Sequence, residues 1–541
     1  MIFLCEGETP IQLKINFQKH YLLWIAGVFL GAIVFIRLRL LGLPLERDEG
    51  EYAYIAQQLL QGVLPYTESH SMKFPGIYFA YAGVLTVFGE SPVAIHFSLL
   101  FTNIATAFLL YLLGSKLLNQ SAGIVAGVTF SALTLSPSLQ GTWANSEHFV
   151  LLPAIGGVLL LWVPQEKPAR FILSGFLLGF ALLIKQHAVF FFLFGLVFLS
   201  VTAFAQSYKL KKLILSVGFF LIGGVVPIFT SASIYWLYGN FSDFWFSTYQ
   251  YASEYVSMIS LSQGFEDFKY SCIHILESNF SILLLSLIGI VAMAPIKRAR
   301  REYLFIIGFF LFSFLAIIPG LYFRPHYFLL LIPAFSLFAG AGFTILMDRF
   351  LSSRFKPLIS LGILTLVLGL PVWIQKDFFF TLPIFKATKL VYGANPFVES
   401  LEVAKYIREH SQKDDRIAVL GSEPQIYFYA QRRSATRHIY MYPLMEKHIF
   451  AREMQIELIR EIESSQPKWI VSVNVPTSWL FRRYSSPLLM AWEPIYLNRE
   501  YKVSGIVDVF SHKEPLYKWG EKASNYTPVS SKNIIIYERR T

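Results

Sequence analysis

Three of the four carboxylates in the run LERDEGEY (45–52) have the types and the spacing that chemistry at a membrane surface would use. Asp48, Glu49 and Glu51 follow directly on the first long apolar stretch of the chain, which begins near Tyr21. A carboxylate near apolar surroundings can have a raised pKa and then serve as a general base. Two carboxylates can also hold a divalent cation against phosphate oxygens. The run is therefore a candidate catalytic site.

The same run can also be explained as the start of a helix. Apolar residues continue it at helical spacing, which predicts a helix lying in the membrane interface. That apolar stripe consists of Tyr52, Ile55, Ala56, Leu59 and Leu60. Asp48 would then be the N-cap, and Glu51, three residues on, would complete a capping box. The cap accounts for Asp48 and Glu51 but not for Glu49. The residues alone therefore do not decide whether the run is a catalytic site or a helix cap.

The composition predicts a multi-pass membrane protein. The 541 residues are 55% hydrophobic and only 15% charged, and the mean hydropathy is +0.50. A soluble chain of this length would carry more charge and shorter apolar runs. The first run, from Tyr21 to Leu41, is too long for a signal-peptide core, so we interpret it as a retained anchor. The two cysteines, Cys5 and Cys272, form no zinc or redox motif.

Eleven apolar runs are candidate spans, because each approaches the roughly 20 residues that cross a bilayer, while the run 76–89 is short and ambiguous. The eleven are approximately 21–43, 93–115, 121–138, 147–163, 170–184, 187–205, 212–238, 279–296, 303–319, 326–347 and 357–376. The net charge is +11, but Lys and Arg gather in short clusters between the runs, as they do in cytoplasmic loops. We favour this topology signal over a nucleic-acid surface, so no nucleic acid is expected as a partner.

The basic clusters also predict which loops face outward. They are Lys116 and the segments 165–170, 209–212, 297–302 and 348–356. If the N-terminal segment 14–20 is cytoplasmic and 76–89 does not cross, every cluster falls on the cytoplasmic side. If 76–89 crosses, all of them move outside. We therefore interpret 76–89 as a re-entrant or interfacial segment, and the loop 45–92 as extracytoplasmic.

The tail of the chain changes character and predicts a second domain. Residues 1–376 would form the transmembrane domain, and residues 377–541 an extracytoplasmic C-terminal domain. Buried strands are predicted at 415–421 and 467–473, and helices at 395–411 and 450–464. Strands that alternate with helices predict a small α/β domain.

Further charged side chains fall near apolar runs on the same outer face. They are Lys73, Glu147, His148, Lys185, His187, Arg324 and His326. Each one alone is better explained as a snorkelling cation or as an interface residue with nothing bound. Together they set cations opposite carboxylates at one leaflet, and charge buried at a membrane is costly and tends to be functional. The set suits a phosphate-bearing, lipid-linked ligand.

With these residues in place, the sequence resembles the membrane-embedded GT-C glycosyltransferases. The resemblance is to the group of the protein O-mannosyltransferases and lipid A aminoarabinose transferases. Four segments carry it in order: RDEGEYAYIAQQLLQG (47–62), KFPGIYFAYAGVLTVFG (73–89), GFLLGFALLIKQ (175–186) and RPHYFLLLIPAFSLFAG (324–340). The tail, especially 419–443, resembles the extracytoplasmic α/β domain of some bacterial members.

The resemblance implies a GT-C-like fold of about eleven transmembrane helices with a C-terminal α/β domain. It implies transfer of a hexose or pentose, with inversion, from a polyprenyl-phosphate carrier to a glycan, lipid or protein acceptor. It places the protein in the plasma (inner) membrane with the N-terminus in the cytoplasm. Asp48 would activate the acceptor and Glu49 would support it. The donor phosphate would be bound by Lys73, Lys185, Arg324 and His326, and the rest of the substrate by Tyr52, Glu147 and Tyr327.

One position departs from the pattern of the relatives. They often carry Glu immediately before the lysine of the second motif, where it can bind a metal, and here that position is Met72. Glu68 or His70 could take its place. A divalent cation therefore stays open as a cofactor.

Two other classes of protein compete with this interpretation. A lipid-linked-sugar flippase or transporter is the alternative, but such proteins often show inverted repeats and interrupted helices, and the sequence shows no such symmetry. A non-catalytic receptor would not need carboxylates and cations converging on one face. A cytoplasmic nucleotide-sugar enzyme is disfavoured, because the sequence has no Gly-rich phosphate loop and the tail has no D-x-D motif.

Overall fold

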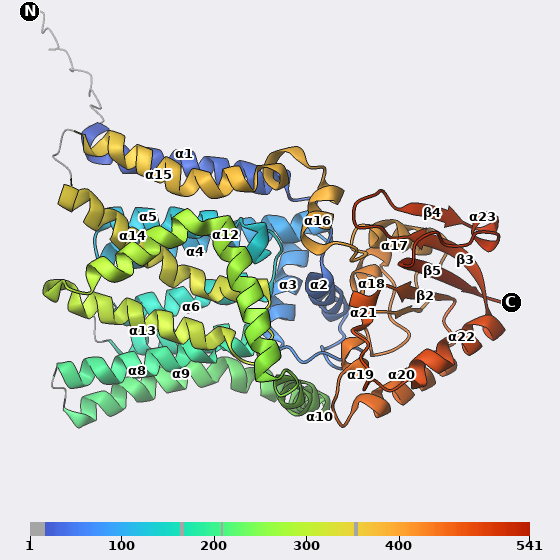
Figure 1. Ribbon diagram of the computed structural model, residues 1–541. Helices are drawn as coiled ribbons and strands as arrows, with labels where there is room; N and C mark the ends of the chain where they lie inside the picture. The colour runs from blue at the N-terminus through green and yellow to red at the C-terminus, as the bar shows by residue number, and fades with distance from the viewer. Residues whose placement is uncertain (1–16, 163–166, 207–208, 351–354, 541) are drawn as a thin grey trace, which may run out of the picture.

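A bundle of long helices and a smaller domain built on a β-sheet make up the chain (Figure 1). The computed structural model describes residues 17–162, 167–206, 209–350 and 355–540. The predicted cytoplasmic segment 14–20 begins outside these residues, and the clusters 165–170 and 348–356 lie partly outside them. The described residues confirm the predicted fold class, a mostly α-helical multi-pass membrane protein with a small C-terminal sheet domain.

Each of the eleven predicted spans coincides with one helix of the bundle. The helices are α1 (Phe17–Arg39), α4 (Pro92–Leu117), α5 (Gln120–Leu133), α6 (Ser146–Trp162), α7 (Pro168–Ile184), α8 (Val189–Ala205), α9 (Leu210–Leu237), α12 (Leu261–Met293), α13 (Arg300–Ile317), α14 (Ile332–Phe350) and α15 (Lys356–Ile374). In the described part of the chain, 7 helices are long and apolar enough to cross a membrane. Among the shorter apolar helices are α5, α6 and α7.

Helix α12 begins well before the predicted run at 279 and bends there. Asn279 has non-helical φ and ψ of −128° and 21°, and its amide donates to the Ile275 carbonyl and to Ser136 Oγ. The predicted boundary is therefore a kink, and the first part of α12 belongs to the region expected to be a loop.

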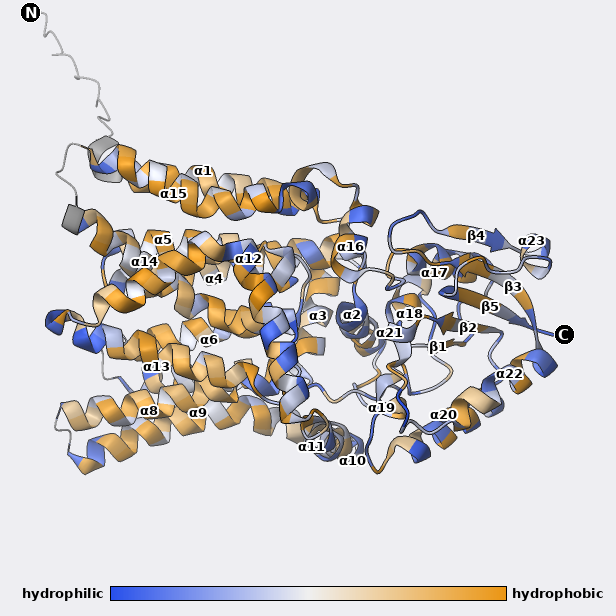
Figure 2. Cartoon of the chain, viewed as in Figure 1, coloured by the Kyte–Doolittle hydropathy of each residue, from blue (hydrophilic) through white to orange (hydrophobic). Residues whose placement is uncertain are grey.

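Hydrophobic residues make up most of the bundle helices (Figure 2), and many of their side chains are exposed. On α9 Phe229 is 68% exposed, and on α15 Leu366 is 66% exposed. Exposed apolar surface on this scale is expected only where a lipid or a partner covers it. The outward apolar faces of the bundle thus fit contact with hydrocarbon chains.

Glycines let the bundle helices approach closely, as is common where hydrocarbon cannot drive helices together. A Cβ at Gly175 of α7 would lie 1.9 Å from the Phe220 carbonyl oxygen of α9, and one at Gly223 of α9 would lie 2.0 Å from the Ile172 carbonyl oxygen. The pair α12 and α14 meets in the same way through Gly289. These contacts leave no room for a side chain.

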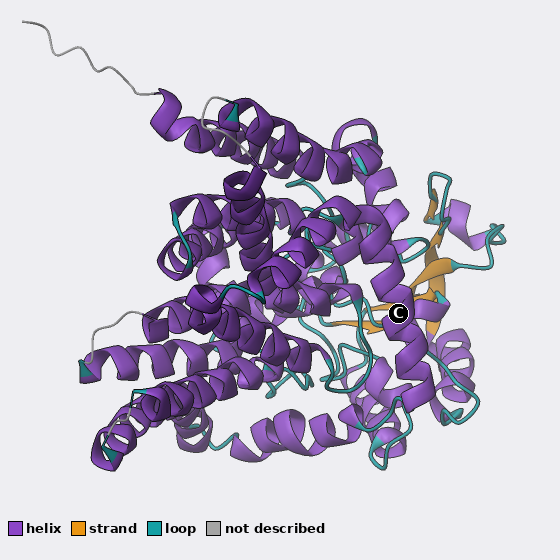
Figure 3. Ribbon diagram, turned by 60° about the vertical axis from the view of Figure 1, so that its left-hand side comes forward, coloured by secondary structure: helices purple, strands orange, loops and turns teal. Residues whose placement is uncertain are grey.

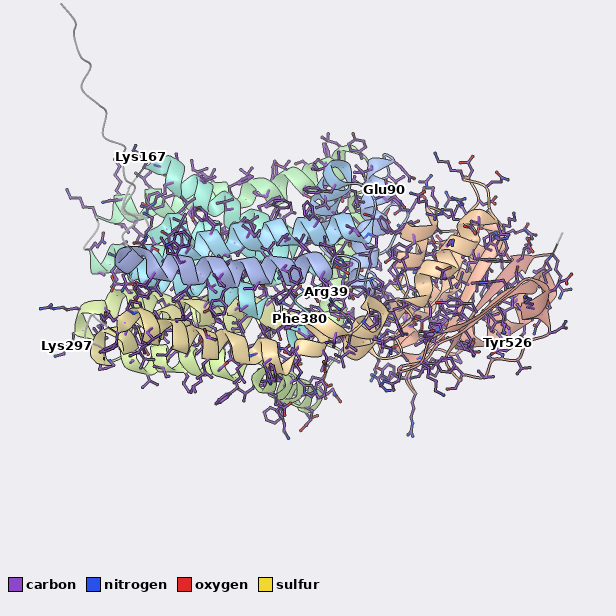
Figure 4. The ribbon with its side chains drawn as sticks, turned by 90° about the horizontal axis from the view of Figure 1, so that it is seen from above. Arg39, Glu90, Lys167, Lys297, Phe380 and Tyr526 are labelled. Carbon is purple, nitrogen blue, oxygen red and sulfur yellow. The ribbon has the colours of Figure 1, made fainter. Side chains whose placement is uncertain are left out.

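Basic residues gather at the end of the bundle that lies away from the sheet. Figure 4 shows Lys167 and Lys297 at that end and Glu90 at the opposite end, near the sheet domain. The Trp162 indole donates to the Lys116 carbonyl, and the Arg301 guanidinium lies 4.4 Å from the same ring, so these loops meet. Lys116, Lys167, Lys297 and Arg301 therefore share one end of the bundle, as the predicted topology requires.

Short elements fill the space between the bundle and the sheet domain. They are α2 (Arg47–Leu60), α3 (Gly76–Phe88), α10 (Phe241–Trp245), a π-helix (Phe246–Tyr251), α11 (Ala252–Val256), α16 (Ile384–Tyr392), a second π-helix (Asp377–Thr381) and the 3₁₀ helices Pro137–Leu139, Gln186–Ala188 and Pro325–Leu331. Helix α2 confirms the predicted helix, but it is buried on nearly every face, between α3 and the sheet domain. An interfacial helix with one apolar stripe would be half exposed.

The C-terminal part folds around a five-stranded sheet, and the strands lie on one side of the molecule (Figure 3). The strands are β1 (Ile417–Leu420), β2 (Trp469–Asn474), β3 (Tyr501–Asp508), β4 (Leu516–Trp519) and β5 (Asn533–Arg539), in the order β1-β2-β5-β3-β4. The pair β1 and β2 is parallel and the others are antiparallel. The helices are α17 (Glu399–Glu409), α18 (Gln425–Ala430), α19 (Tyr442–Met445), α20 (Ala451–Ser465), α21 (Pro476–Trp479), α22 (Leu488–Glu500) and α23 (Glu521–Ser524). Both predicted strands and both predicted helices are present.

Gly223→Ala tests the close packing of α7 against α9. The new methyl group would collide with the α7 backbone, and overpacking of this kind typically costs about 1–3 kcal/mol. We expect a lower melting temperature for the purified protein in detergent. Gly218→Ala on the same helix is the matched control, because a Cβ there meets nothing within 4 Å. Equal melting temperatures for the two variants would contradict the packing described.

Candidate active site

A cavity of about 420 Å³ lies between the bundle and the sheet domain. Its walls come from α2, the loop before α3, the start of α8, the segment 246–256, the loop before the Pro325–Leu331 helix, and the start of α19. The titratable groups other than tyrosine on these walls are Asp48, Glu51, His70, Lys73, Lys185, His187, Arg324 and Glu446. The cavity thus brings Asp48 and Lys73 of the loop 45–92 together with Arg324, which is distant in the sequence.

The start of α2 differs from the predicted cap, which was wrong. Glu46 is the N-cap, and its side chain accepts from the Glu49 N–H at 3.0 Å, while the Glu49 carboxylate accepts from the Glu46 N–H at 3.0 Å. The same three-residue spacing fits Asp48 with Glu51, but the helix starts two residues earlier. The Asp48 side chain therefore takes no part in the cap and lies in the cavity wall.

Lys73 lies between two carboxylates of α2. Its Nζ donates to Asp48 Oδ1 and to Glu51 Oε2, at 2.9 Å each. The Tyr52 ring lies 4.5 Å from the same nitrogen, so the ammonium is also held by a cation–π contact. Tyr440 of the sheet domain donates its hydroxyl to Asp48 Oδ1 at 3.2 Å. Both domains therefore hold the Asp48 carboxylate.

The surroundings of Asp48 lower its pKa, contrary to the prediction of a raised one. Burial alone would raise the pKa of the carboxyl, but the ammonium of Lys73 outweighs burial, and His326 and Arg324 add to its effect. The pKa of Lys73 is raised in turn: burial lowers it, and Asp48 and Glu51 more than offset this. The apolar surroundings of Asp48 could be predicted from the sequence, but its direct contact with Lys73 could not.

Glu147 and Lys185 form a second buried ion pair beside the first. Lys185 Nζ donates to Glu147 Oε1 at 2.5 Å, and His326 Nε2 lies 4.0 Å from that oxygen. The Tyr327 ring lies 4.3 Å from Lys185 Nζ. Lys185 and Tyr327 line the cavity, whereas Glu147 and His326 stand behind them.

Arg324 is a cation of the cavity wall with no carboxylate partner among the described residues. Its guanidinium lies 5.6 Å from the Tyr322 ring. Burial would lower the pKa of Arg324, but Tyr255, Tyr327, Tyr440 and Asp48 outweigh burial and raise it, so the guanidinium stays charged. The wall therefore keeps positive charge available for an anion.

Glu49 does not line the cavity, although we predicted that it supports Asp48 in catalysis. It is fully buried, and its carboxylate binds the His96 ring at 3.0 Å and accepts from the Ala144 N–H, in addition to its part in the capping box. The contacts with His96 and Ala144 join α2 to the bundle. Glu49 therefore positions the helix that carries Asp48.

Arg47 and Gly50 of the opening run dock α2 onto the sheet domain, a role that the sequence did not reveal. Arg47 Nη2 donates to the fully buried Glu423 at 2.5 Å, and Arg47 Nη1 donates to the Tyr442 hydroxyl at 2.8 Å. A Cβ at Gly50 would lie 2.6 Å from the backbone nitrogen of Gln425. The face of α2 next to Asp48 is thus occupied by the C-terminal domain.

The sheet domain also contributes cavity residues that sequence reasoning missed. They are Tyr440, Tyr442, Pro443, Glu446 and Met454, and the segment before α12 adds Tyr251 and Tyr255. Glu446 accepts from the Tyr251 hydroxyl at 2.8 Å, and burial raises its pKa. The sequence does contain an aromatic run here, YMYP (440–443). Its residues reach the cavity only because the sheet domain docks onto the bundle, and the sequence alone does not reveal that docking.

The arginines of the basic segment 431–438 form ion pairs and hydrogen bonds with other residues of the chain. Arg433 pairs with Glu68 at 3.0 Å, and Arg437 pairs with Asp243 at 3.1 Å. The guanidinium of Arg432 donates to several backbone carbonyls around it. These contacts fasten the sheet domain internally and to the loops of the bundle.

Asp48 and Glu51, the two cavity carboxylates that Lys73 bridges, do not fit a divalent cation in this arrangement. The place between Asp48 and Glu51 is taken by Lys73 Nζ, which satisfies one oxygen of each. Met72 offers only a thioether, and Glu68 is engaged with arginines of the sheet domain. We therefore derive no step through a metal at these carboxylates.

Glu423→Gln tests the docking of α2. Arg47 would be left as a buried cation without its ion pair, which typically costs about 3–5 kcal/mol. We expect a lower melting temperature and faster hydrogen exchange in α2. Glu402→Gln is the control, because Glu402 is exposed on α17. If the Glu423 variant melts and exchanges like the Glu402 variant, the buried pair does not hold the domains together.

Comparison with known proteins supports the same fold. Residues 69–236 match the model of the family described as dolichyl-phosphate-mannose-protein mannosyltransferase. The chain is similar to the crystal structure of ArnT from Cupriavidus metallidurans bound to undecaprenyl phosphate, with a TM-score of 0.58 and 12% identity, over 95% of this chain and 98% of that chain. No curated protein sequence matches the chain.

Two structures from Archaeoglobus fulgidus are similar as well. The oligosaccharyltransferase in the apo form has a TM-score of 0.52 and 11% identity, over 95% of this chain and 76% of that chain. AglB in complex with an inhibitory peptide and a dolichol-phosphate has a TM-score of 0.50 and 12% identity, over 94% of this chain and 75% of that chain. Such low identities show the fold. The chain is thus a membrane protein of the GT-C glycosyltransferase fold, and its residues 69–236 match the mannosyltransferase family, as the resemblance implied.

Proposed function

We propose that this protein is an inverting glycosyltransferase that moves a monosaccharide from a polyprenyl-phosphate carrier to a glycan, lipid or protein acceptor. One observation carries the proposal: a single cavity holds Asp48, neutralised by Lys73, together with Arg324, a cation without a carboxylate partner among the described residues. The match to a family of dolichyl-phosphate-mannose users supports it. A scaffold would not need this convergence of buried charge.

The cations of the cavity would bind the donor phosphate. Lys73, Lys185 and Arg324 all line it. The planar guanidinium of Arg324 can hold two phosphate oxygens at once, whereas the ammonium groups act as point charges. Apolar side chains next to these cations would accept the isoprenoid chain: Ile184, Val189 and Phe190.

Asp48 would be the base that receives the proton of the acceptor. In the free protein Lys73 keeps the Asp48 carboxylate ionised but weakly basic. A phosphate that attracts Lys73 would weaken this ion pair and return basicity to Asp48. Donor binding would then fix the leaving group and activate the base in one event.

The reaction balances with one carboxylate. The acceptor oxygen or nitrogen attacks the anomeric carbon and its proton goes to Asp48, while the bond from that carbon to the phosphate oxygen breaks with both electrons leaving on the phosphate. A phosphate leaves well without a second acid, unlike the leaving group in glycoside hydrolysis. A single displacement inverts the anomeric centre.

The other predicted substrate residues would act in two ways. Tyr327 lines the cavity and can contact the sugar, as can Tyr251, Tyr255 and Tyr440 with their rings and hydroxyls. Tyr52 and Glu147 hold Lys73 and Lys185, respectively, and so would position the cations. His326 stands behind the same pair.

We place the cavity at the extracytoplasmic face of the plasma membrane, with the N-terminus in the cytoplasm. The basic clusters lie at the opposite end of the bundle, where the positive-inside rule predicts the cytoplasm (Figure 4). The sheet domain would then be extracytoplasmic.

Asp48→Asn is the direct test of the proposed chemistry. Purified protein is incubated with a panel of polyprenyl-phosphate monosaccharides and acceptors, and release of the free carrier is measured. Because a general base typically contributes 10²- to 10⁴-fold, we expect the variant to be at least about 100-fold slower than the wild type.

The matched control for this test is Glu90→Gln, a carboxylate near the sheet domain that binds Gln57 outside the cavity. This variant should turn over like the wild type. A folded Asp48 variant with full turnover would contradict the assignment. Movement of the lipid-linked sugar across the membrane with no glycosidic bond formed would favour a flippase instead.

The pH dependence gives a separate prediction. The folded-state pKa of Asp48 lies below the ordinary carboxyl value, so the carboxylate stays ionised down to lower pH than a free aspartate. We expect the acid side of kcat/KM to fall only below about pH 4. An acid limb centred between about pH 6 and 7 would point to a histidine base in place of Asp48.

A further inference from the structure

Three metal-ligand side chains meet at the junction of the two domains, beside the ion pairs of the cavity. His70 comes from the loop between α2 and α3, His438 from the segment after α18, and Glu457 from α20. One ligand atom from each residue lies within 4.8 Å of the others. Glu457 Oε2 lies 2.9 Å from His438 Nε2 and 3.5 Å from His70 Nε2.

These separations fit a single small cation. A tetrahedral ion with bonds of about 2.1 Å places its ligand atoms about 3.4 Å apart. Two imidazoles and one carboxylate form a common donor set for zinc, with a fourth position open to water. Magnesium prefers an all-oxygen octahedron, so this set disfavours it.

Hydrogen bonds within the protein do not use the two rings fully. Both Nε2 atoms approach the same carboxylate oxygen, and the Nδ1 atoms of His70 and His438 are buried without a hydrogen-bond partner. The ring centroids are 4.7 Å apart.

The charges around the cluster leave one carboxylate oxygen for a cation. Arg437 Nη1 lies 3.6 Å from Glu457 Oε1, the other oxygen, and Asp243 pairs with the same guanidinium at 3.1 Å. The Glu457 side chain is 38% exposed, which gives an ion a route from solvent. Arg437 therefore orients the carboxylate and does not occupy the ligand position.

We propose that His70, His438 and Glu457 bind one transition-metal ion of the zinc class, which fastens the loop of the bundle that carries Lys73 to the sheet domain. His70 precedes Lys73 by three residues, and its N–H already donates to the Arg437 carbonyl at 2.7 Å. A metal bond from this ring would fix the loop more strongly than that one hydrogen bond. His70 also lines the cavity that holds Asp48, but the metal site does not depend on the Asp48 chemistry and stands whether or not the proposed function is right.

Zinc titration of the full-length protein in detergent tests the site. After treatment with chelator, the wild type should bind about one zinc per chain with ZnCl₂ alone, measured by calorimetry and by metal analysis after desalting. Binding to the folded state alone raises stability, so we expect the melting temperature to rise by roughly 2 °C or more. MgCl₂ at the same concentration should leave it unchanged.

Glu457→Gln and His438→Asn should abolish both the bound zinc and the zinc-dependent rise, while His512→Ala, at an exposed histidine of the sheet domain, should keep both. The amide introduced by Glu457→Gln could still accept a hydrogen bond from His438, so loss of zinc in that variant would separate a metal site from a hydrogen-bonded trio. If the wild type binds no more zinc than the His438 variant, or if zinc stabilises all variants equally, the proposal is overturned. These readouts do not depend on enzyme activity.

Discussion

A buried ammonium between two carboxylates is the interaction on which the candidate site depends. Lys73 satisfies Asp48 and Glu51 at once, and without it two acids of one helix turn would face each other in the cavity wall. Buried charges of like sign raise each other's pKa values and would protonate. The lysine therefore keeps Asp48 ionised at neutral pH, and its release would decide when that carboxylate becomes basic.

The sheet domain completes this arrangement. Arg47 is fixed by Glu423, and Tyr440 reaches Asp48, so the residue before the carboxylate and the carboxylate itself are held by a part of the chain almost 400 positions away. The bundle holds the other face of α2 through Glu49. Helix α2 is clamped from both sides, which suits a site whose charges must keep their distances.

Much of the fold was predictable because lipid imposes simple rules on sequence. Long apolar runs and basic clusters located the helices and their shared end, and they put Asp48, Lys73 and Arg324 on one face before any contact was known. The start of α2 was not predictable, because Glu46 with Glu49 and Asp48 with Glu51 have the same spacing. Only the packing around Glu49 chooses between them. Tyr440 and Glu446 were missed because tertiary docking alone brings the tail to the cavity. The lowered pKa of Asp48 was missed for the same reason.

The most direct test of the account is an experimental structure with a bound polyprenyl phosphate. We expect the phosphate in the cavity, within hydrogen-bond distance of Arg324, with Lys73 turned from Asp48 toward the phosphate oxygens. A phosphate bound at another place, with the pair of Lys73 and Asp48 unchanged and Arg324 without contact to it, would contradict the central claim.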